Sequence, residues 1–146
     1  MGRYCCIHEN IVERLRKTFR YSVALVVWGM IKGIGVDITE AKRFGKTKDE
    51  KAFLKQVFTN DEIKNADNFS SKNKYWARLF AIKEALLKAF KTGLHHGSYW
   101  QDININGTFV VTLSGYFKKL LNRKTKVFVA HSCSKKYAAS IAFIQD

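Results

Sequence analysis

The sequence predicts an α+β fold in which a mostly antiparallel sheet packs against a long buried helix. Apolar segments typical of strands lie near both ends of residues 30–146. Between them, residues 75–91 are apolar around most of the helix circumference, as in a helix that is buried on several sides. The expected order of elements is β-α-α-α-β-β-α-β-β, which indicates an α+β protein with a largely antiparallel sheet.

The first expected strand covers residues 30–38. Its glycines, Gly33 and Gly35, predict either a bulge or a place where a second backbone approaches closely. We expect one helix over residues 39–58, because apolar residues recur at helical spacing towards the end of this segment.

A second helix is expected to begin at Thr59, because Thr59 and Glu62 form a capping-box pattern. Residues 65–74 are rich in Asn, Ser and Lys and are expected to form a loop before the long helix. Thr92-Gly93 predicts the end of the long helix, with the glycine just after the last turn.

The pair Asn106-Gly107 lies between two alternating segments, 102–105 and 108–113, and predicts a tight hairpin. The remaining expected elements are a short helix over residues 116–122 and strands over residues 126–130 and 137–144.

Composition indicates one basic domain. The chain has 146 residues, of which 47% are hydrophobic, a size suited to one domain rather than two. Lys and Arg total 26 against 12 for Asp and Glu, a net charge of +14. This excess favours an anionic partner, such as nucleic acid, an acidic protein, an anionic membrane or a phosphorylated small molecule. The three cysteines do not form a disulfide framework of the secreted type, so we expect a reducing, cytoplasmic location.

Residues 1–29 are expected to form an extension that precedes a single domain over residues 30–146. The extension either packs on the domain or results from a start codon upstream of the true initiator, Met30. Its apolar run, residues 21–28, is shorter than the roughly 20 apolar residues of a membrane-spanning helix, so we expect no membrane partner.

Two carboxylates interrupt apolar segments: Asp37 at the end of the first strand and Glu84 in the long helix. Burial of an ionised carboxylate costs several kcal/mol unless a cation or hydrogen bonds compensate it, which suggests a shared partner. A hard divalent cation is the expected shared partner. The alternatives are a strand-end cap for Asp37 and an ordinary helix salt bridge between Glu84 and Lys88.

Other polar residues add to this pattern. At about 100° per residue, Glu84, Lys88 and Lys91 fall on one stripe of an otherwise apolar helix. His131 is either a ligand-binding residue or a hydrogen-bonded core histidine.

Several segments match one family in order, and together they resemble the holo-acyl-carrier-protein synthases, the small bacterial 4′-phosphopantetheinyl transferases. The resemblance covers essentially all of residues 30–146. The matching segments are Gly33-Ile34-Gly35-Val36-Asp37-Ile38 followed by Arg43, Phe58-Thr59 with Glu62, Phe80-Ala81-Ile82-Lys83-Glu84-Ala85 continuing through Lys88-Ala89-Phe90 to Thr92-Gly93, Asp102-Ile103, and His131-Ser132 with Tyr137-Ala138.

The chain also departs from the family pattern. Family members usually carry Arg before the Phe of the central motif and Gly before Thr-Gly, whereas this chain has Leu79 and Lys91, with Arg78 displaced by one residue. The Gly-Lys-Pro that commonly follows the hairpin strand is replaced by Asn106-Gly107. A non-catalytic relative that binds the carrier protein is therefore one alternative.

The resemblance implies the 4′-phosphopantetheinyl transferase fold and Mg²⁺-dependent transfer of 4′-phosphopantetheine from coenzyme A to a serine of an acidic apo acyl carrier protein. It implies that Asp37 and Glu84 hold the metal and act in catalysis with Lys88, which would bind a phosphate oxygen or help to deprotonate the serine. A metal-bound water is the alternative base. Family members are trimers with shared sites, so a homotrimer is also implied. The implied coenzyme A-binding residues are Lys88, Thr92, Gly93, His131 and Ser132, and the implied carrier-protein-binding residues are Arg43 and Lys42.

A basic nucleic-acid-binding domain is the main competing hypothesis, since it explains the charge. Such a domain needs aromatic residues exposed for stacking or a helix that fits a groove, whereas Trp76, Phe80 and Phe90 lie in the apolar helix and are predicted core residues. That hypothesis also leaves Asp37 and Glu84 unexplained, so we expect no nucleic-acid partner.

Overall fold

The computed structural model describes residues 30–45, 50–95 and 97–146, and the expected extension, residues 1–29, lies outside the described residues. Strands β1, β5 and β4 form a three-stranded sheet in that order, and both of its pairings are antiparallel. Strands β2 and β3 form a separate antiparallel pair. The strands are β1 (Ile31–Glu40), β2 (Ile103–Ile105), β3 (Val111–Leu113), β4 (Lys126–Cys133) and β5 (Tyr137–Gln145).

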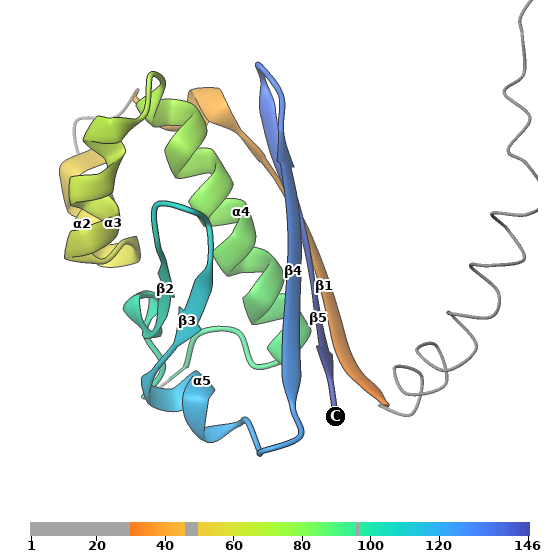
Figure 1. Cartoon of the computed structure of the whole chain (residues 1–146). Coiled ribbons are helices and arrows are strands. Elements are labelled where there is room, and N and C mark those ends of the chain that lie inside the picture. Colours follow the sequence, from red (N-terminus) through yellow and green to blue (C-terminus); the bar gives the residue numbers. More distant parts are fainter. Residues whose placement is uncertain (1–29, 46–49, 96) are drawn as a thin grey trace, which may run out of the picture. The chain divides into compact units, whose positions relative to one another are not determined.

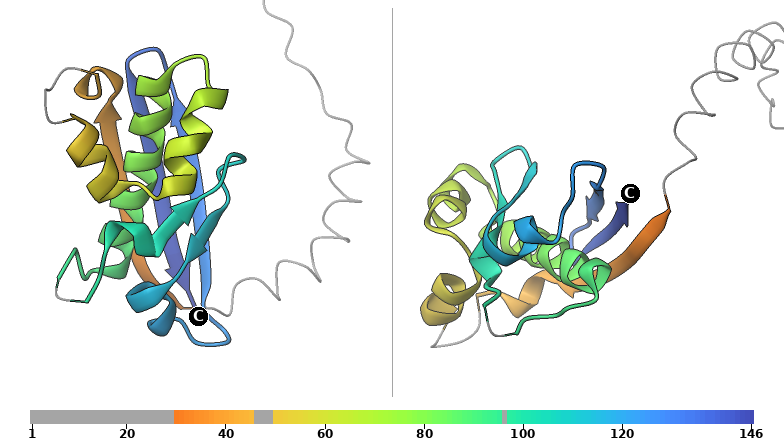
Figure 2. Two further views of the ribbon diagram at one scale, coloured as in Figure 1. Left: turned by 90° about the vertical axis from the view of Figure 1, so that its left-hand side faces the viewer. Right: turned by 90° about the horizontal axis from the view of Figure 1, so that it is seen from below.

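Helix α4 (Lys72–Phe90) is the central element of the fold, and it packs on the inner face of the three-stranded sheet (Figure 1). The β2–β3 pair and helices α2 and α3 lie on the opposite side of α4, so α4 forms the middle layer (Figure 2). This arrangement confirms the predicted antiparallel sheet against a long buried helix. The other helices are η1 (Ala41–Arg43), α2 (Glu50–Val57), α3 (Asn60–Asn65), η2 (Ala66–Asn68), η3 (Trp100–Asp102) and α5 (Gly115–Lys119).

The two glycines of β1 allow α4 to approach the sheet closely. A β-carbon on Gly33 would overlap the carbonyl oxygen of Ala89, and one on Gly35 would overlap that of Ala85. A side chain at either position would push the helix away from the strand, because both obstacles are backbone atoms. The pairing of β1 with β5 also shifts register between Ile31 and Gly33. The predicted close approach and the predicted bulge therefore both occur in this strand.

The expected helix over residues 39–58 is wrong in its first half. Strand β1 continues through Thr39 and Glu40, which pair with Ala138 and Tyr137 of β5. The backbone N–H of Ala41 then donates to the carbonyl of Lys136 at 2.8 Å. Pairing with a distant strand outweighs local helical spacing here, and α2 begins only at Glu50.

The capping box that opens α3 is confirmed: the Thr59 side chain accepts from the Glu62 N–H, and the Glu62 carboxylate accepts from the Thr59 N–H. The expected loop over residues 65–74 is shorter than predicted, because η2 occupies its first part and α4 begins at Lys72. The Tyr75 N–H donates to the Ser71 carbonyl at 3.1 Å, which starts the helical ladder.

The hairpin is wider than the predicted two-residue turn. Ile105 pairs with Val111, and the Asn106 side chain organises the loop by accepting from the N–H groups of Thr108 and Val110. Phe109 has a positive φ of 62° in this loop. The short helix α5 begins one residue earlier and ends earlier than predicted, at Gly115 and Lys119. Strand β4 continues beyond the predicted residue 130 to Cys133.

Candidate active site

The close crossing of β1 and α4 places a lysine of the helix against a carboxylate of the strand. Asp37 lies two residues beyond Gly35, on the same inward face of β1. The Lys88 Nζ lies 2.7 Å from Asp37 Oδ1 and donates to the Val36 carbonyl at 3.0 Å. The Thr39 hydroxyl donates to Asp37 Oδ2 at 2.8 Å, so both oxygens of this carboxylate are oriented.

Glu84 is the second carboxylate at this crossing. It lies one turn before Lys88 on α4 and is half-buried. Burial raises the pKa of Glu84, the charge of Asp37 raises it further, and the charges of Lys88 and Arg43 oppose this rise. Asp37 and Glu84 therefore lie close enough to repel each other. The alternative of a Glu84–Lys88 salt bridge is wrong, because among the described residues Lys88 pairs with Asp37.

These carboxylates are suitable ligands for a hard divalent cation. Glu84 makes no hydrogen bond or ion pair with another described residue, and a cation would relieve its repulsion from Asp37. The described residues contain no group of three or more His, Cys, Asp or Glu side chains arranged to hold a metal. Two carboxylates fit Mg²⁺, which usually keeps several waters and takes its other ligands from substrate phosphates.

A cavity of about 320 Å³ opens beside Glu84, between the end of α4 and the segment that leads to η3. The three residues of the predicted polar stripe, Glu84, Lys88 and Lys91, all line this cavity, as does the predicted Gly93. The stripe prediction is therefore confirmed. Leu87, Leu94 and Trp100 form the apolar part of the wall.

The helix ends differently from the prediction. Helix α4 stops at Phe90, and its C-cap is Lys91, which adopts the left-handed conformation at φ 60° and ψ 16°. Gly93 also has a positive φ, 58°, but it lies two residues further on. Thr92 lies between them, and its Oγ1 is buried without a hydrogen-bond partner among the described residues.

The neighbouring residues His131 and Ser132 lie on opposite faces of β4, because side chains alternate along a strand. His131 shares an inward-facing row with Ser140 and Asp37 across the three strands. Ser132 is exposed on the outward side. Both residues line a groove of about 320 Å³ on the sheet, which shares no residue with the cavity beside Glu84. Within one chain, the predicted coenzyme A-binding residues therefore lie at two separate places.

His131 is not the hydrogen-bonded core histidine that was one alternative. Its Nδ1 atom is buried without a hydrogen-bond partner among the described residues. Burial lowers the pKa of His131, and the charge of Arg78 lowers it further. The Arg78 guanidinium lies 4.5 Å from the ring centre of Phe109, whose ring lies 5.0 Å from that of His131. The displaced arginine thus faces His131, while Leu79 is fully buried in the core.

The predicted carrier-protein-binding residues, Lys42 and Arg43, lie on η1 directly after β1 and are both exposed. The Arg43 guanidinium lies 4.7 Å from the centre of the Phe80 ring. Its charge lowers the pKa of Glu84, so Arg43 lies close to the carboxylates.

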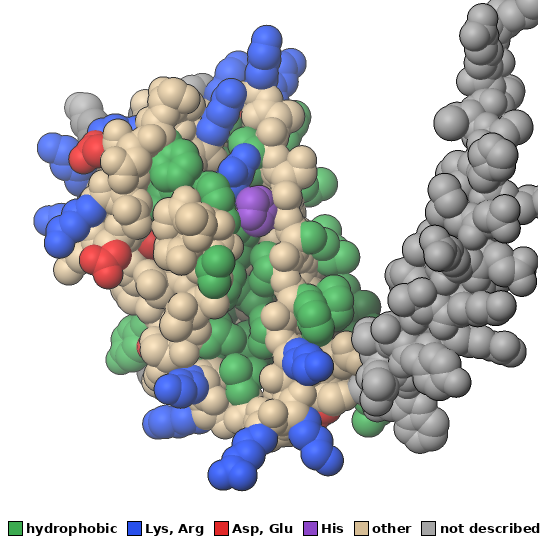
Figure 3. All heavy atoms as spheres, viewed as in Figure 1, with side chains coloured by type: hydrophobic (Ala, Val, Ile, Leu, Met, Phe, Trp, Pro, Cys, Tyr) green, Lys and Arg blue, Asp and Glu red, His purple; other side chains and the backbone are tan. Residues whose placement is uncertain are grey.

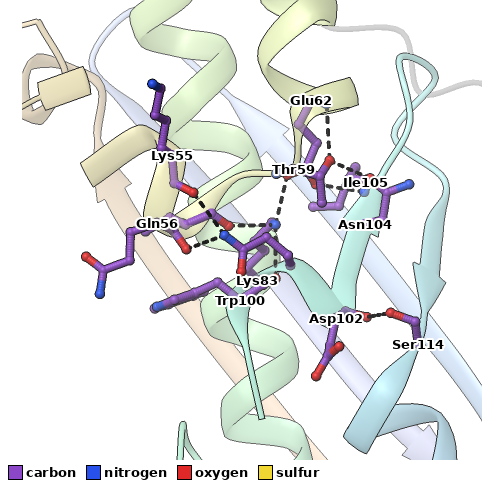
Figure 4. Close-up of polar contacts among 12 residues, drawn as sticks. Lys55, Gln56, Thr59, Glu62, Lys83, Trp100, Asp102, Asn104, Ile105 and Ser114 are labelled. Atoms are coloured by element: carbon purple, nitrogen blue, oxygen red, sulfur yellow. Dashed lines mark hydrogen bonds and ion pairs between the residues drawn. The ribbon is translucent and has the colours of Figure 1, made fainter. Parts of the chain in front are cut away.

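Sequence reasoning missed a buried ion pair next to this site. The Lys83 Nζ lies 2.9 Å from Glu62 Oε2 and also donates to the carbonyls of Val57 and Trp100, at 3.0 and 3.1 Å (Figure 4). Glu62 Oε1 accepts from the Ile105 N–H at 2.8 Å. Both side chains of the pair are fully buried. A charged residue on the most apolar face of the helix was the available signal.

The same network shifts two further protonation equilibria. Burial lowers the pKa of Lys83, and Glu62 opposes this effect. Burial and the charge of Glu62 raise the pKa of Tyr75, whose hydroxyl donates to the Glu62 carbonyl, to about 12. Because every polar atom of the pair has a protein partner, the pair ties α2, α3, η3 and β2 to α4 and has no capacity left for a ligand.

Comparison with known families identifies the class of this fold and site. Residues 33–142 match the model of the 4′-phosphopantetheinyl transferase superfamily. The chain therefore belongs to the 4′-phosphopantetheinyl transferase superfamily, and it is a phosphopantetheinyl transferase.

The chain is also similar to individual proteins that are named as synthases. The chain is 33% identical over 126 residues to the holo-[acyl-carrier-protein] synthase of Pelagibacter ubique, covering 79% of this chain and 97% of that protein. It is 30% identical over 125 residues to the synthase of Bartonella bacilliformis, covering 79% of this chain and 94% of that protein.

Solved structures agree with this result. The crystal structure of the Bacillus anthracis holo-(acyl-carrier-protein) synthase, in complex with CoA (3′,5′-ADP), has a TM-score of 0.63 at 27% identity and covers 80% of this chain and 98% of that one. The Neisseria meningitidis synthase has the same fold, with a TM-score of 0.66 at 24% identity, covering 80% of this chain and 100% of that one. In the part of the chain that the structure describes, no helix has the length and apolar character needed to cross a membrane.

Proposed function

We propose that this phosphopantetheinyl transferase is a holo-[acyl-carrier-protein] synthase that uses coenzyme A and Mg²⁺. The observation that carries the proposal is the meeting of Asp37 and Glu84 at the crossing of β1 and α4, beside a cavity lined by Lys88 and Lys91. Two carboxylates next to a basic cavity suit a substrate that brings both a diphosphate and its metal ion.

The reaction would move a phosphopantetheinyl group between two oxygens. The serine oxygen of the carrier protein would bond to the β-phosphorus of coenzyme A, and the bond from that phosphorus to the bridging oxygen would break. The serine proton would pass to a base, and adenosine 3′,5′-bisphosphate would leave. Asp37 and Glu84 would hold Mg²⁺, which supplies charge neutralisation on the phosphate oxygens when bound.

Lys88 is suited to bind phosphate at this place. Its side chain is half-exposed, and its ammonium group is held at the crossing by Asp37 and the Val36 carbonyl. A phosphate oxygen entering the cavity would find an oriented donor, and such preorganised donors account for much of the catalysis of phosphoryl transfer. Assistance in deprotonating the serine is a second role that this position permits.

The separate locations of the coenzyme A-binding residues support a shared site. We infer that Lys88, Thr92 and Gly93 of one chain and His131 and Ser132 of a neighbouring chain contact the same coenzyme A in a homotrimer. The outer face of the three-stranded sheet carries large exposed apolar side chains, which gather over the strands in Figure 3. Exposed apolar patches of this kind favour association. The exposed apolar residues of this face are Ile34, Val36, Ile38, Phe128, Tyr137 and Ile141.

The carrier protein would approach along η1. Arg43 and Lys42 are exposed there, and Arg43 acts electrostatically on Glu84, so a basic surface borders the carboxylates. An acidic carrier protein would be steered to this surface by complementary charge. The nucleic-acid hypothesis has less support, because Trp76 and Phe80 are only 4% and 5% exposed and are not available for stacking.

Mass spectrometry of the carrier protein tests this proposal. The full-length chain is incubated with coenzyme A, Mg²⁺ and an apo acyl carrier protein, with a parallel sample containing a chelator. We expect the carrier protein to gain the mass of one phosphopantetheine only in the sample with Mg²⁺. An unmodified carrier protein that still binds the chain would support the non-catalytic relative, and tight oligonucleotide binding without transfer would support the nucleic-acid hypothesis.

A further inference from the structure

We propose that Lys91 is a second phosphate-binding cation of the active site and that it contacts the diphosphate of coenzyme A together with Lys88. This inference rests on the proposed function and adds a substrate-binding residue to it.

The backbone of Lys91 is the first observation. This residue is the C-cap of α4 and has φ 60° and ψ 16°, in the left-handed region. Residues other than Gly, Asn and Asp rarely adopt this backbone conformation, because their β-carbon crowds the following carbonyl oxygen. A lysine therefore occupies a position where glycine would be less strained, and strain that persists at a ligand-binding site points to a role for the side chain.

The surroundings of Lys91 are the second observation. Lys91 is exposed and lines the cavity of about 320 Å³ together with Glu84, Lys88 and Gly93. Lys88 is engaged with Asp37, whereas Lys91 makes no ion pair within residues 30–45, 50–95 and 97–146. Its charge is thus available to an anion that enters the cavity.

The position of the cavity indicates which part of coenzyme A Lys91 would contact. Glu84 lines the same cavity, and the proposed metal site at Asp37 and Glu84 would lie at the diphosphate.

Three variants of the full-length chain separate charge from backbone strain. Lys91→Gln removes the charge and keeps the strain, Lys91→Gly removes both, and Lys91→Arg keeps both. Lys124→Gln is the matched control, because Lys124 is an exposed lysine that does not line the cavity. The measurements are the Kd for coenzyme A by calorimetry in the presence of Mg²⁺, the thermal midpoint Tm, and transfer to the carrier protein.

For Lys91→Gly we expect the affinity for coenzyme A to fall and the thermal stability to rise. Lys91→Gln and Lys91→Gly should each weaken coenzyme A binding about fivefold, which corresponds to loss of one contact of about 1 kcal/mol. Lys91→Gly should also raise Tm by roughly 3 °C, because glycine relieves the left-handed strain. Lys91→Arg and Lys124→Gln should bind coenzyme A as the unmodified chain does. A residue with only a structural role would not improve stability while losing affinity.

Dephospho-coenzyme A, which keeps the diphosphate and lacks the 3′-phosphate, identifies the contacted group. We expect Lys91→Gln to weaken binding of this ligand by the same factor of about five. Equal binding of this ligand by Lys91→Gln and by the unmodified chain would overturn the assignment to the diphosphate. Unchanged coenzyme A binding in Lys91→Gln, in a chain that transfers phosphopantetheine normally, would overturn the role of Lys91 alone. Absence of both binding and transfer in the unmodified chain would overturn the proposed function and this inference with it.

Discussion

Helix α4 carries two lysine–carboxylate pairs little more than one turn apart, and they differ mainly in exposure. Lys83 and Glu62 are separated by 2.9 Å and are both 0% exposed, whereas Lys88 and Asp37 are separated by 2.7 Å and are 49% and 14% exposed. The chemistry of the paired groups is the same in the two places. Their surroundings therefore decide which pair stabilises the fold and which pair can bind a ligand.

The buried pair is saturated with protein partners, because Lys83 has three oxygen acceptors and each Glu62 oxygen accepts at least one hydrogen bond. The exposed pair adjoins a cavity and a third charged group, Glu84, which has no pairing partner among the described residues. A saturated pair gives rigidity, and an unsaturated group of charges next to solvent gives a binding site.

Loss of the site carboxylates should have the largest effect of the changes considered. Asp37→Asn and Glu84→Gln should each reduce transfer by roughly a hundredfold or more, because each would remove a ligand of the proposed Mg²⁺, whose charge would stabilise the transition state by several kcal/mol. The double variant should lose little more, since ligands of one ion act as a unit. Steady-state transfer rates measure this effect, and Tm close to that of the unmodified chain serves as the control. Efficient transfer by either single variant at ordinary Mg²⁺ would contradict the metal assignment.

Breaking the buried pair should instead affect stability. Lys83→Met leaves the Glu62 carboxylate buried without its cation and should lower the free energy of unfolding by about 3–5 kcal/mol. Adding Glu62→Gln should recover part of this loss, because no unpaired charge then remains. Urea denaturation of the two variants measures the difference. A Lys83→Met protein as stable as the unmodified chain would show that the pair is not a structural element.

The exposed basic surface on η1 should affect association. Arg43→Glu should raise the apparent KM for the carrier protein strongly, change the KM for coenzyme A much less, and flatten the salt dependence of kcat/KM. Initial rates at several salt concentrations measure these changes. An equal rise in both KM values would indicate damage to the whole site rather than loss of steering.

The smallest effect concerns His131, whose pKa is lowered from its ordinary value of 6.5 by burial and by Arg78. Because the folded state holds the proton less tightly than the unfolded state, the stability from neutral His131 is present above about pH 6.5 and is lost as the pH falls below it. The free energy of unfolding should therefore decline between pH 7 and pH 5, and His131→Asn should make this decline shallower. Identical slopes for the two proteins would contradict the assignment.

The sequence was sufficient for features that depend on local pattern. The glycines of β1, the capping box at Thr59 and the polar stripe of α4 all lie where the pattern predicts them. Each depends on residues that are close in the chain, or on a requirement that only glycine meets. The placement of Asp37 against α4 follows from Gly33 and Gly35 in the same way.

Features that depend on distant partners could not be obtained from local pattern. Thr39 and Glu40 are strand residues because β5 pairs with them, and Glu62 meets Lys83 because α3 packs on α4. The sequence could have predicted that His131 and Ser132 lie on opposite faces of β4, because this requires only that the strand extend past residue 130. The left-handed backbone of Lys91 had no signal in the residue itself, because lysine does not predict it; the glycine that family members usually carry at this position does predict it.

The most direct test of the different roles of the two pairs compares two double variants, Lys83→Met/Glu62→Gln and Asp37→Asn/Lys88→Met. The measurement is kcat/KM for phosphopantetheine transfer at a temperature well below both Tm values. We expect the first variant to retain transfer within about tenfold despite lower stability, because its pair does not contact substrate. We expect the second to keep a Tm near that of the unmodified chain and to lose transfer by roughly a hundredfold or more. Loss of transfer in a folded Lys83→Met/Glu62→Gln protein, or its retention in Asp37→Asn/Lys88→Met, would contradict this account.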